Sequence, residues 1–310
     1  MSDASATPTP GAYASTFNKI MVAASEPSIP TPIDPNTTSS QFAGVGSITI
    51  SSSQGTFRCS GAAISGRHVL TAAHCFDPDD NGDAASVNLA STTFNLNFGG
   101  NLTHQLTASS IDMHPDFTGF DNGIFDDIAI LTLGSDVPTG LPIYDLTTTQ
   151  VPTGEEITMV GYGRSGSPGA GYTIGSSSIV KRVGNNVYDS FFFDDEGSGE
   201  REVFRFDFDD PDAPGSDAIA NESTTGPGDS GGPSFIDDGA GGLLLFGVNT
   251  FTTGSAPAFG SGGGGMLVAG YSDWINSIVN PAVADIPAPA PVSVLFAGLG
   301  FLAFRKYRNA

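Results

Sequence analysis

The sequence predicts an all-β fold with a single helix near the end of the chain. Glycine and proline are abundant, at 41 and 21 of 310 residues, and favour many turns between short strands. Several segments alternate polar and apolar residues, which is the period of a strand with one buried face. Many short strands followed by one terminal helix are typical of β-barrels or a β-sandwich.

Strand-like patterning runs from residue 44 to residue 279, without a repeat of solenoid length. Segments that alternate like half-buried strands are residues 47–50, 87–90, 94–98 and 204–208. The largely apolar runs at residues 127–131 and 243–246 fit buried strands. Near the end, Tyr271, Trp274, Ile275 and Ile278 recur at helical spacing, which predicts a helix over residues 271–279.

The charge balance excludes one class of partner. The chain has 33 acidic and 11 basic residues and a net charge of −22, whereas a nucleic-acid binder needs Lys and Arg to neutralise phosphates. A hydrophobic content of 39% with only 14% charged residues indicates a folded core rather than a disordered acidic chain.

The two ends differ from the body in composition. Residues 1–40 are rich in Ser, Thr, Ala and Pro, and we interpret them as a disordered leader or propeptide-like segment. No ordinary signal peptide is visible, because no basic stretch precedes an apolar run there. Two alternatives are open, a disordered terminus and a start placed downstream of the true one.

Residues 280–310 combine a Pro-rich spacer at 287–291, thirteen apolar residues at 292–304 and a basic end. The apolar run is shorter than the roughly 17–25 residues of a membrane span. A small hydrophobic helix packed on the body is one interpretation. The layout also resembles the C-terminal sorting segments of the PEP-CTERM type in Gram-negative bacteria, with Ala288 in place of the motif's Glu. That resemblance implies export to the cell envelope or the medium, with transient membrane anchoring through this segment and handling by a sorting machinery.

Three separate segments carry residues of one chemistry. His74 lies in residues 71–75, Asp127 begins an apolar run, and Ser230 lies in the glycine-rich residues 228–233. A Ser hydroxyl needs an adjacent base to act as a nucleophile, and His supplies one near neutral pH. A buried carboxylate is costly unless it has a partner, such as the imidazole that it would orient. The glycines allow a sharp turn whose N–H groups face a ligand.

Together with residues 59–65, 161–163 and 272–275, these segments resemble the chymotrypsin-like (trypsin-fold) serine peptidases over residues 44–279. The resemblance implies two perpendicular six-stranded antiparallel β-barrels with a C-terminal helix. The peptidase domain would span residues 41–279, with the first barrel at about 41–145 and the second at about 150–270. His74 and Asp127 from the first barrel would then meet Ser230 from the second, and the N–H groups of Gly228 and Ser230 would form the oxyanion hole.

The resemblance also implies a disulfide between Cys59 and Cys75, although two reduced thiols are the alternative in a reducing compartment. It places Thr224 at the base of the substrate pocket, with Thr250 and Phe251 beside it. Because Thr224 is uncharged, we expect a small or medium uncharged substrate side chain there. The acidic chain as a whole would instead favour basic substrates.

Activation is a further open point, because members of the family often pair a freed N-terminus with the Asp before the nucleophile, here Asp229. No basic residue followed by the usual apolar N-terminus is present. Ile33 lies at a plausible distance, but it is flanked by Pro32 and Asp34. Arg164 or another polar residue is the alternative partner.

The acidic segments suggest at most a structural ion. Asp77, Asp79, Asn81 and Asp83 match the start of an EF-hand-like calcium loop, although Asn88 stands where the usual Glu would be. A solvated acidic turn is the equal alternative. We interpret the acidic insert at residues 189–217 as solvated rather than as a second metal site. The remaining histidines, which show no ligand-like spacing, are taken as structural: His68, His104 and His114.

The leading hypothesis is therefore an exported serine endopeptidase that acts on proteins or peptides and requires no cofactor, with Ca²⁺ possible as a structural ion. The alternative is a catalytically inactive surface module that binds peptides on a peptidase scaffold.

Overall fold

The computed structural model describes residues 33–120, 123–214, 216–220 and 222–281, and in addition the backbone of residues 20–24. The C-terminal spacer, apolar run and basic end that suggested a sorting segment lie outside the described residues. Within those residues, no helix is both long and apolar enough to span a membrane.

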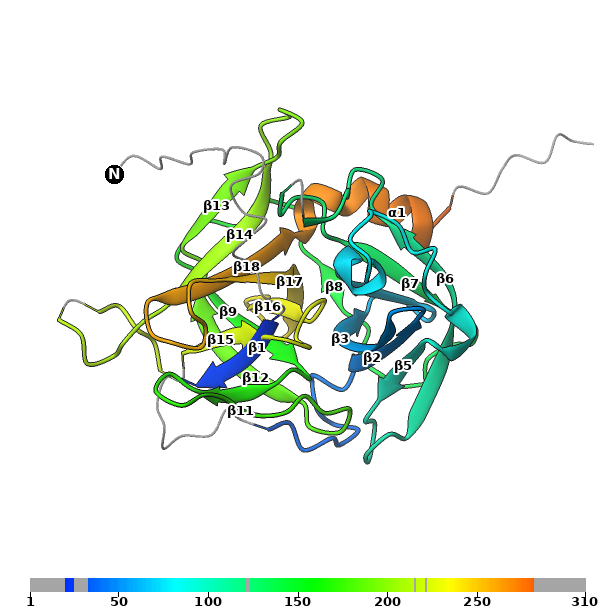
Figure 1. Ribbon diagram of the computed structural model, residues 1–310, viewed down its shortest axis with the longest axis horizontal. Coiled ribbons are helices and arrows are strands. Elements are labelled where there is room, and N and C mark those ends of the chain that lie inside the picture. Colours follow the sequence, from blue (N-terminus) through cyan, green and yellow to red (C-terminus); the bar gives the residue numbers. More distant parts are fainter. Residues whose placement is uncertain (1–19, 25–32, 121–122, 215, 221, 282–310) are drawn as a thin grey trace, which may run out of the picture.

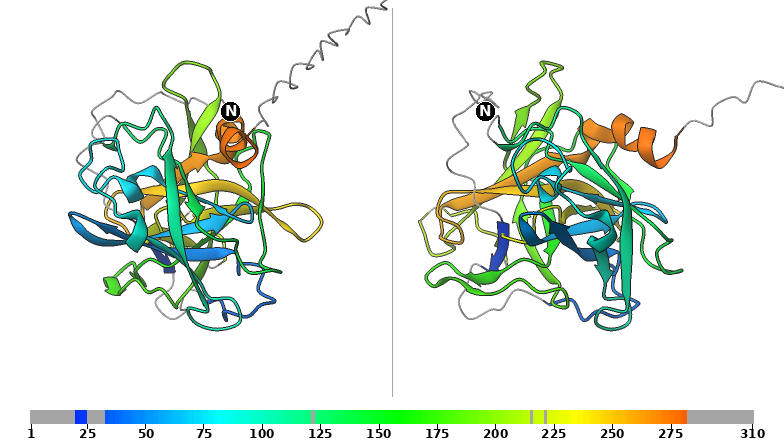
Figure 2. Two further views of the ribbon diagram at one scale, coloured as in Figure 1. Left: turned by 90° about the vertical axis from the view of Figure 1, so that its right-hand side faces the viewer. Right: turned by 45° about the vertical axis from the view of Figure 1, so that its right-hand side comes forward.

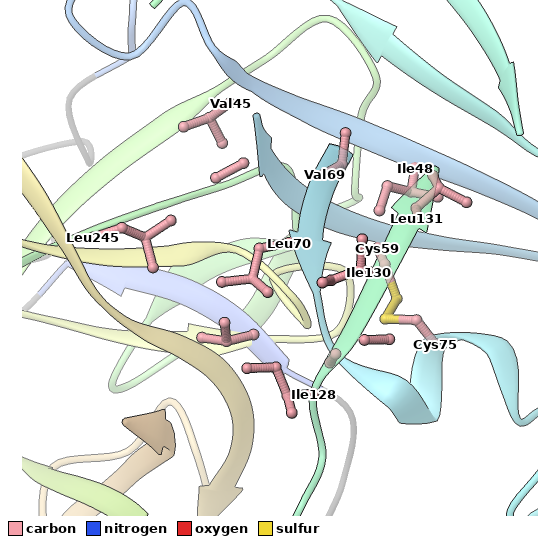
Figure 3. Packing of buried hydrophobic residues seen from close by; sticks show 14 of the residues in the cluster. Val45, Ile48, Cys59, Val69, Leu70, Cys75, Ile128, Ile130, Leu131 and Leu245 are labelled. Carbon is pink, nitrogen blue, oxygen red and sulfur yellow. A yellow bond between two sulfur atoms is a disulfide. The ribbon is translucent and has the colours of Figure 1, made fainter. Parts of the chain in front are cut away.

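The first half of the chain forms a closed antiparallel barrel in the order β2-β3-β4-β7-β6-β5 (Figure 1). Its strands are β2 (Val45–Ser52), β3 (Gly55–Ala63), β4 (His68–Thr71), β5 (Thr93–Leu96), β6 (His104–Met113) and β7 (Ala129–Leu133). Side chains such as Ile48, Val69 and Leu131 fill it and are fully buried (Figure 3). The alternating segment 47–50 and the apolar residues 129–131 therefore both form strands, but β2 is not half-buried as its pattern predicts, because Ser47 is buried as fully as Ile48.

The second half forms an eight-stranded sheet in the order β12-β9-β16-β17-β18-β14-β13, with β8 parallel to β17. Its strands are β8 (Asp145–Leu146), β9 (Glu156–Gly161), β12 (Arg182–Val187), β13 (Ser190–Phe193), β14 (Arg201–Phe208), β16 (Pro233–Asp237), β17 (Leu243–Thr253) and β18 (Ser261–Leu267). The side-chain amide of Asn186 on β12 donates to the carbonyl oxygens of Asp207 at 2.7 Å and Ser223 at 2.8 Å. A side chain thus links β12 to β14, where the sheet has no continuous ladder between those strands.

The second sheet lies beside the first barrel (Figure 1), and short elements complete the fold, which Figure 2 shows from two further sides. The remaining strands are β1 (Ile20–Ala24), β10 (Ser165–Ser167), β11 (Gly171–Ile174) and β15 (Ser223–Gly226). Short 3₁₀ turns occupy Ala73–Phe76, Leu89–Ser91 and Val268–Tyr271, and the helix α1 covers Ser272–Val279. The all-β class with one C-terminal helix is confirmed.

Two expectations need correction. Residues 87–90 are not a strand, because β2 ends at Ser52 and leaves only Val87 paired with it, after which the chain enters a 3₁₀ turn. Residues 33–40 belong to the folded body rather than to a disordered leader. Asp34 is buried there, and β1 pairs with β15.

A buried ion pair fastens this N-terminal stretch to the second half. The Lys181 ammonium group, which is fully buried, lies 3.4 Å from Asp34 Oδ1 and donates to the carbonyl oxygen of Phe42 at 2.7 Å. Removing one partner of a buried pair leaves the other charge uncompensated, at a cost of about 3–5 kcal/mol.

We therefore expect Lys181→Met to lower the free energy of unfolding by about 3 kcal/mol, because the Asp34 carboxylate loses its cation. The double variant Lys181→Met/Asp34→Asn should recover part of that loss. Urea unfolding of the full chain measures both, and equal stability of the single variant and the parent would contradict the pairing.

The disulfide between Cys59 and Cys75 is present and closes a loop with a sequence separation of 16 (Figure 3). Closing a loop of this size lowers the entropy of the unfolded chain and so raises the free energy of unfolding by about 3 kcal/mol in the chain-entropy model.

We expect Cys59→Ala/Cys75→Ala to lower the free energy of unfolding by about that amount. Reduction of the parent protein should shift its thermal midpoint towards that of the variant, and a reductant-insensitive parent would argue against the bridge.

Candidate active site

Strand pairing brings His74 and Asp127 together. His74 lies in the 3₁₀ turn that follows β4, and Asp127 lies two residues before β7; Thr71 of β4 pairs with Ala129 of β7. Asp127 Oδ2 lies 2.6 Å from His74 Nδ1, and Asp127 Oδ1 accepts the backbone N–H of His74 at 2.8 Å. Both side chains are buried. The carboxylate therefore holds the ring and its backbone, and His74 Nε2 has no hydrogen-bond partner among the described residues.

Ser230 lies on a turn between β15 and β16 that depends on glycine. Gly228 and Gly231 have φ values of +106° and +78°, which side chains with a Cβ rarely adopt. A Cβ at Gly231 would also collide with the side chain of Thr71 in the first barrel. The glycines of residues 228–233 are thus needed both for the turn and for its close approach to the barrel.

Ser60 joins the two halves at this turn, and the sequence analysis did not single it out. Its N–H donates to the carbonyl oxygen of Ser230 at 2.8 Å, and its Oγ donates to that of Gly228 at 2.8 Å. The same Oγ accepts the N–H of Tyr162 at 3.0 Å. A polar residue at a fully buried position of β3, directly after Cys59, is the sequence signal that could have revealed it.

A cavity of about 260 Å³ is bordered by residues of both the histidine segment and the glycine-rich segment. It is lined by His74, Gly228 and Ser230 together with the disulfide. Among the described residues, no acceptor takes a hydrogen bond from the backbone N–H of Gly228 or Ser230. Those two donors are therefore available for a ligand, as the oxyanion-hole expectation requires.

Two arginines also line this cavity in an otherwise acidic protein. Arg58 precedes the disulfide cysteine, and its Nε is buried without a hydrogen-bond partner among the described residues. Burial lowers the pKa of Arg58. Arg164 donates from its guanidinium to the carbonyl oxygen of Tyr172 at 3.4 Å. The sequence analysis missed Arg58, because nothing in its local pattern indicates a cavity.

Asp229, beside the nucleophile candidate, is held by backbone donors. Gly163 N–H donates to its Oδ1 at 2.8 Å, and Gly226 N–H donates to its Oδ2 at 3.3 Å. Buried Arg182 donates to the carbonyl oxygen of Gly163 at 2.7 Å, and the nearby charge of Asp229 opposes the lowering of the Arg182 pKa by burial. A Cβ at Gly161 or Gly163 would collide with the carboxylate.

The suggested N-terminal partner of Asp229 is not found at that position. Ile33 is 60% exposed and pairs by its backbone with Arg182 in an isolated bridge. Because Gly161 and Gly163 have no side chains, they leave the space that the Asp229 carboxylate occupies.

The residues predicted for substrate selection are not among those that line the 260 Å³ cavity. Thr224, Thr250 and Phe251 are buried, and the hydroxyls of both threonines have no hydrogen-bond partner among the described residues. The glycines at 262–265 of β18 leave no open space beside these residues. A Cβ at any of them would meet the backbone of β14 or β17 or the rings of Phe206 and Phe251.

The acidic loop after His74 is organised by its own backbone. The Asp77 carboxylate accepts the N–H groups of Asn81 and Gly82, each at 2.9 Å, and Asp79 accepts the hydroxyl of Ser86 at 3.0 Å. Asp83 accepts the N–H of Ala85. Calcium binding by Asp77, Asp79, Asn81 and Asp83 stays a prediction.

Comparison with known proteins agrees with this architecture. The family match and the fold together assign the chain to the trypsin-like serine proteases. A family model described as trypsin matches residues 36–275, and the chain belongs to that family. A solved structure of HL collagenase has 20% sequence identity and a TM-score of 0.55, covering 77% of this chain and 94% of the collagenase, which supports the fold. No curated protein matches the chain.

The packing around Asp229 yields a direct test. We expect Gly163→Ala to displace the carboxylate and to lower the free energy of unfolding by about 1–3 kcal/mol, the usual cost of overpacking. Gly169→Ala is the matched control, since nothing lies within 4 Å of a Cβ at that position. Thermal unfolding compares the two, and equal effects would show that the glycine does not serve Asp229.

Proposed function

We propose that this protein is an exported serine endopeptidase with Ser230, His74 and Asp127 as its catalytic triad. The observation that carries the proposal is the His74–Asp127 pair. Asp127 binds His74 Nδ1 and leaves Nε2 without a hydrogen-bond partner among the described residues. His74 and Ser230 line the same cavity. No cofactor is required for this chemistry.

In the proposed reaction, Ser230 Oγ attacks the carbonyl carbon of the peptide bond while His74 Nε2 takes the hydroxyl proton. Asp127 holds Nδ1–H and stabilises the imidazolium. The N–H groups of Gly228 and Ser230 bind the oxyanion. His74 then protonates the leaving amine, the C–N bond breaks, and an acyl-enzyme remains. Water, deprotonated by His74, attacks the ester carbonyl and releases the acid and the Ser230 hydroxyl.

The finer assignments extend this proposal. A small or medium uncharged substrate side chain next to the cleaved bond is supported by Thr224, which offers no charge. Export, and transient anchoring through residues 280–310, are supported by the Pro-rich, apolar and basic layout of that segment. A structural calcium ion in residues 77–83 is supported by the spacing of its acidic residues.

We expect Ser230→Ala to reduce cleavage of casein at least about 10³-fold, because removal of the nucleophile leaves only binding and oxyanion stabilisation. Ser109→Ala is the control, since Ser109 is exposed on β6. A fluorophosphonate probe should label the parent at Ser230. Equal cleavage by Ser230→Ala and the parent would remove the assignment, and binding without cleavage by either would favour the inactive peptide-binding module.

A further inference from the structure

A second cavity, of about 280 Å³, lies where the hairpin of β13 and β14 meets the first barrel and the start of α1. Its lining is mainly acidic and includes Asp116, Asp126, Glu196 and Glu202, with His114 and Tyr271. The acidic insert that the sequence suggested to be solvated thus encloses part of a cavity with carboxylates from both halves of the chain.

Three carboxylates lie close together at this cavity, which is lined by Asp126 and Glu196, with Asp195 next to Glu196 in the chain. Oxygen atoms of Asp126, Asp195 and Glu196 lie within 4.8 Å of one another. Asp126 is buried and comes from the first half, whereas Asp195 and Glu196 are exposed and come from the hairpin. Asp126 Oδ1 also lies 2.9 Å from His114 Nδ1, which makes no hydrogen bond among the described residues, so the imidazole is a close neighbour of this carboxylate.

Glu202 provides an independent indication of a ligand. Its side chain is 5% exposed, and its Oε1 accepts the backbone N–H of Asp126 at 2.9 Å and the hydroxyl of Tyr271. Its Oε2 is buried and has no hydrogen-bond partner among the described residues. A carboxylate oxygen that is desolvated without a partner is costly. Burial and the neighbouring Asp126 raise the pKa of Glu202 to about 8.

Among the described residues, the negative charge of these carboxylates is not neutralised by a Lys or Arg side chain. No ion pair there joins a Lys or Arg to Asp126, Asp195, Glu196 or Glu202. Arg201 lines the cavity, but its guanidinium carbon lies 3.9 Å from the centre of the Phe191 ring and it donates to the carbonyl oxygen of Val151.

We propose that this cavity binds a calcium ion through Asp126, Asp195, Glu196 and Glu202. A hard divalent cation takes six to eight oxygen ligands, and carboxylates are the ones that it prefers in proteins. His114 acts as an outer partner that orients Asp126. The site is distinct from the acidic loop at residues 77–83.

The ion would join the two halves beside the candidate catalytic Asp. Asp126 has a φ of +56°, in the left-handed region, and directly precedes Asp127. The N–H of His114 donates to the carbonyl oxygen of Ile128 at 3.0 Å, so the segment that carries His114 is bound to the residue directly after Asp127. Bound calcium thus restrains the backbone that carries Asp127, and its stabilising effect is independent of whether the protein cleaves peptides.

The test uses the full chain with Ser230→Ala, which removes self-cleavage. The single tryptophan, Trp274, has its ring 5.1 Å from that of His114, so selective tryptophan excitation should sensitise Tb³⁺ bound in this cavity. We expect Tb³⁺ emission that Ca²⁺ displaces, and a thermal midpoint that Ca²⁺ raises. Asp195→Asn/Glu196→Gln should weaken both effects at least about tenfold in concentration.

Glu155→Gln/Glu156→Gln is the matched control, because it removes the same charge from an adjacent exposed acidic pair and should leave the calcium response unchanged. Circular dichroism without calcium checks that all variants fold. An absent calcium response in the parent, or an equal response in Asp195→Asn/Glu196→Gln, would overturn the proposal. Loss of the response in Asp79→Asn/Asp83→Asn instead would place the ion in the acidic loop and would equally overturn it.

Discussion

The hydrogen bonds of Ser60 fix the position of one half of the molecule against the other. His74 and Asp127 come from the first barrel and Ser230 from the second half, so their relative placement depends on contacts across this junction. Ser60 binds the carbonyl oxygens of Gly228 and Ser230 on one side of the junction. Its neighbour Cys59 is bonded to Cys75, directly after His74. The adjacent residues Cys59 and Ser60 of β3 therefore position both the turn that carries Ser230 and the turn that carries His74.

Buried carboxylates organise the rest of the site, and their partners distinguish their functions. Asp127 and Asp229 are both almost fully buried. Asp127 accepts the backbone N–H of His74, and Asp229 accepts those of Gly163 and Gly226. Such donors offset desolvation without a counter-ion. Glu202 is buried to a similar degree but keeps one oxygen without a donor among the described residues. The oxygens of Asp127 and Asp229 are thus occupied by donors of the protein, whereas the free oxygen of Glu202 is the one that we propose binds a cation.

Local sequence patterns predicted the features that depend on neighbouring residues. Alternation located β2, β5 and β14, and the glycine-rich segment around Ser230 indicated its sharp turn. Features that depend on distant partners could not be read in the same way. Residues 33–40 are ordered by Lys181, and residues 87–90 fail to form a strand because β2 ends beside them. The meeting of Asp126 with the β13–β14 hairpin likewise requires both halves of the fold.

Net charge excluded nucleic acids but did not predict the electrostatics of either cavity. The cavity beside Ser230 is lined by Arg58 and Arg164, although the chain carries a charge of −22. The carboxylates of Asp126 and Glu202 line a different cavity. Because interactions between exposed charges weaken beyond about 8 Å at physiological salt, a ligand in either cavity responds to the local groups more than to the total charge. The two cavities share no lining residue, so the charges of either can be changed without substituting a residue that lines the other.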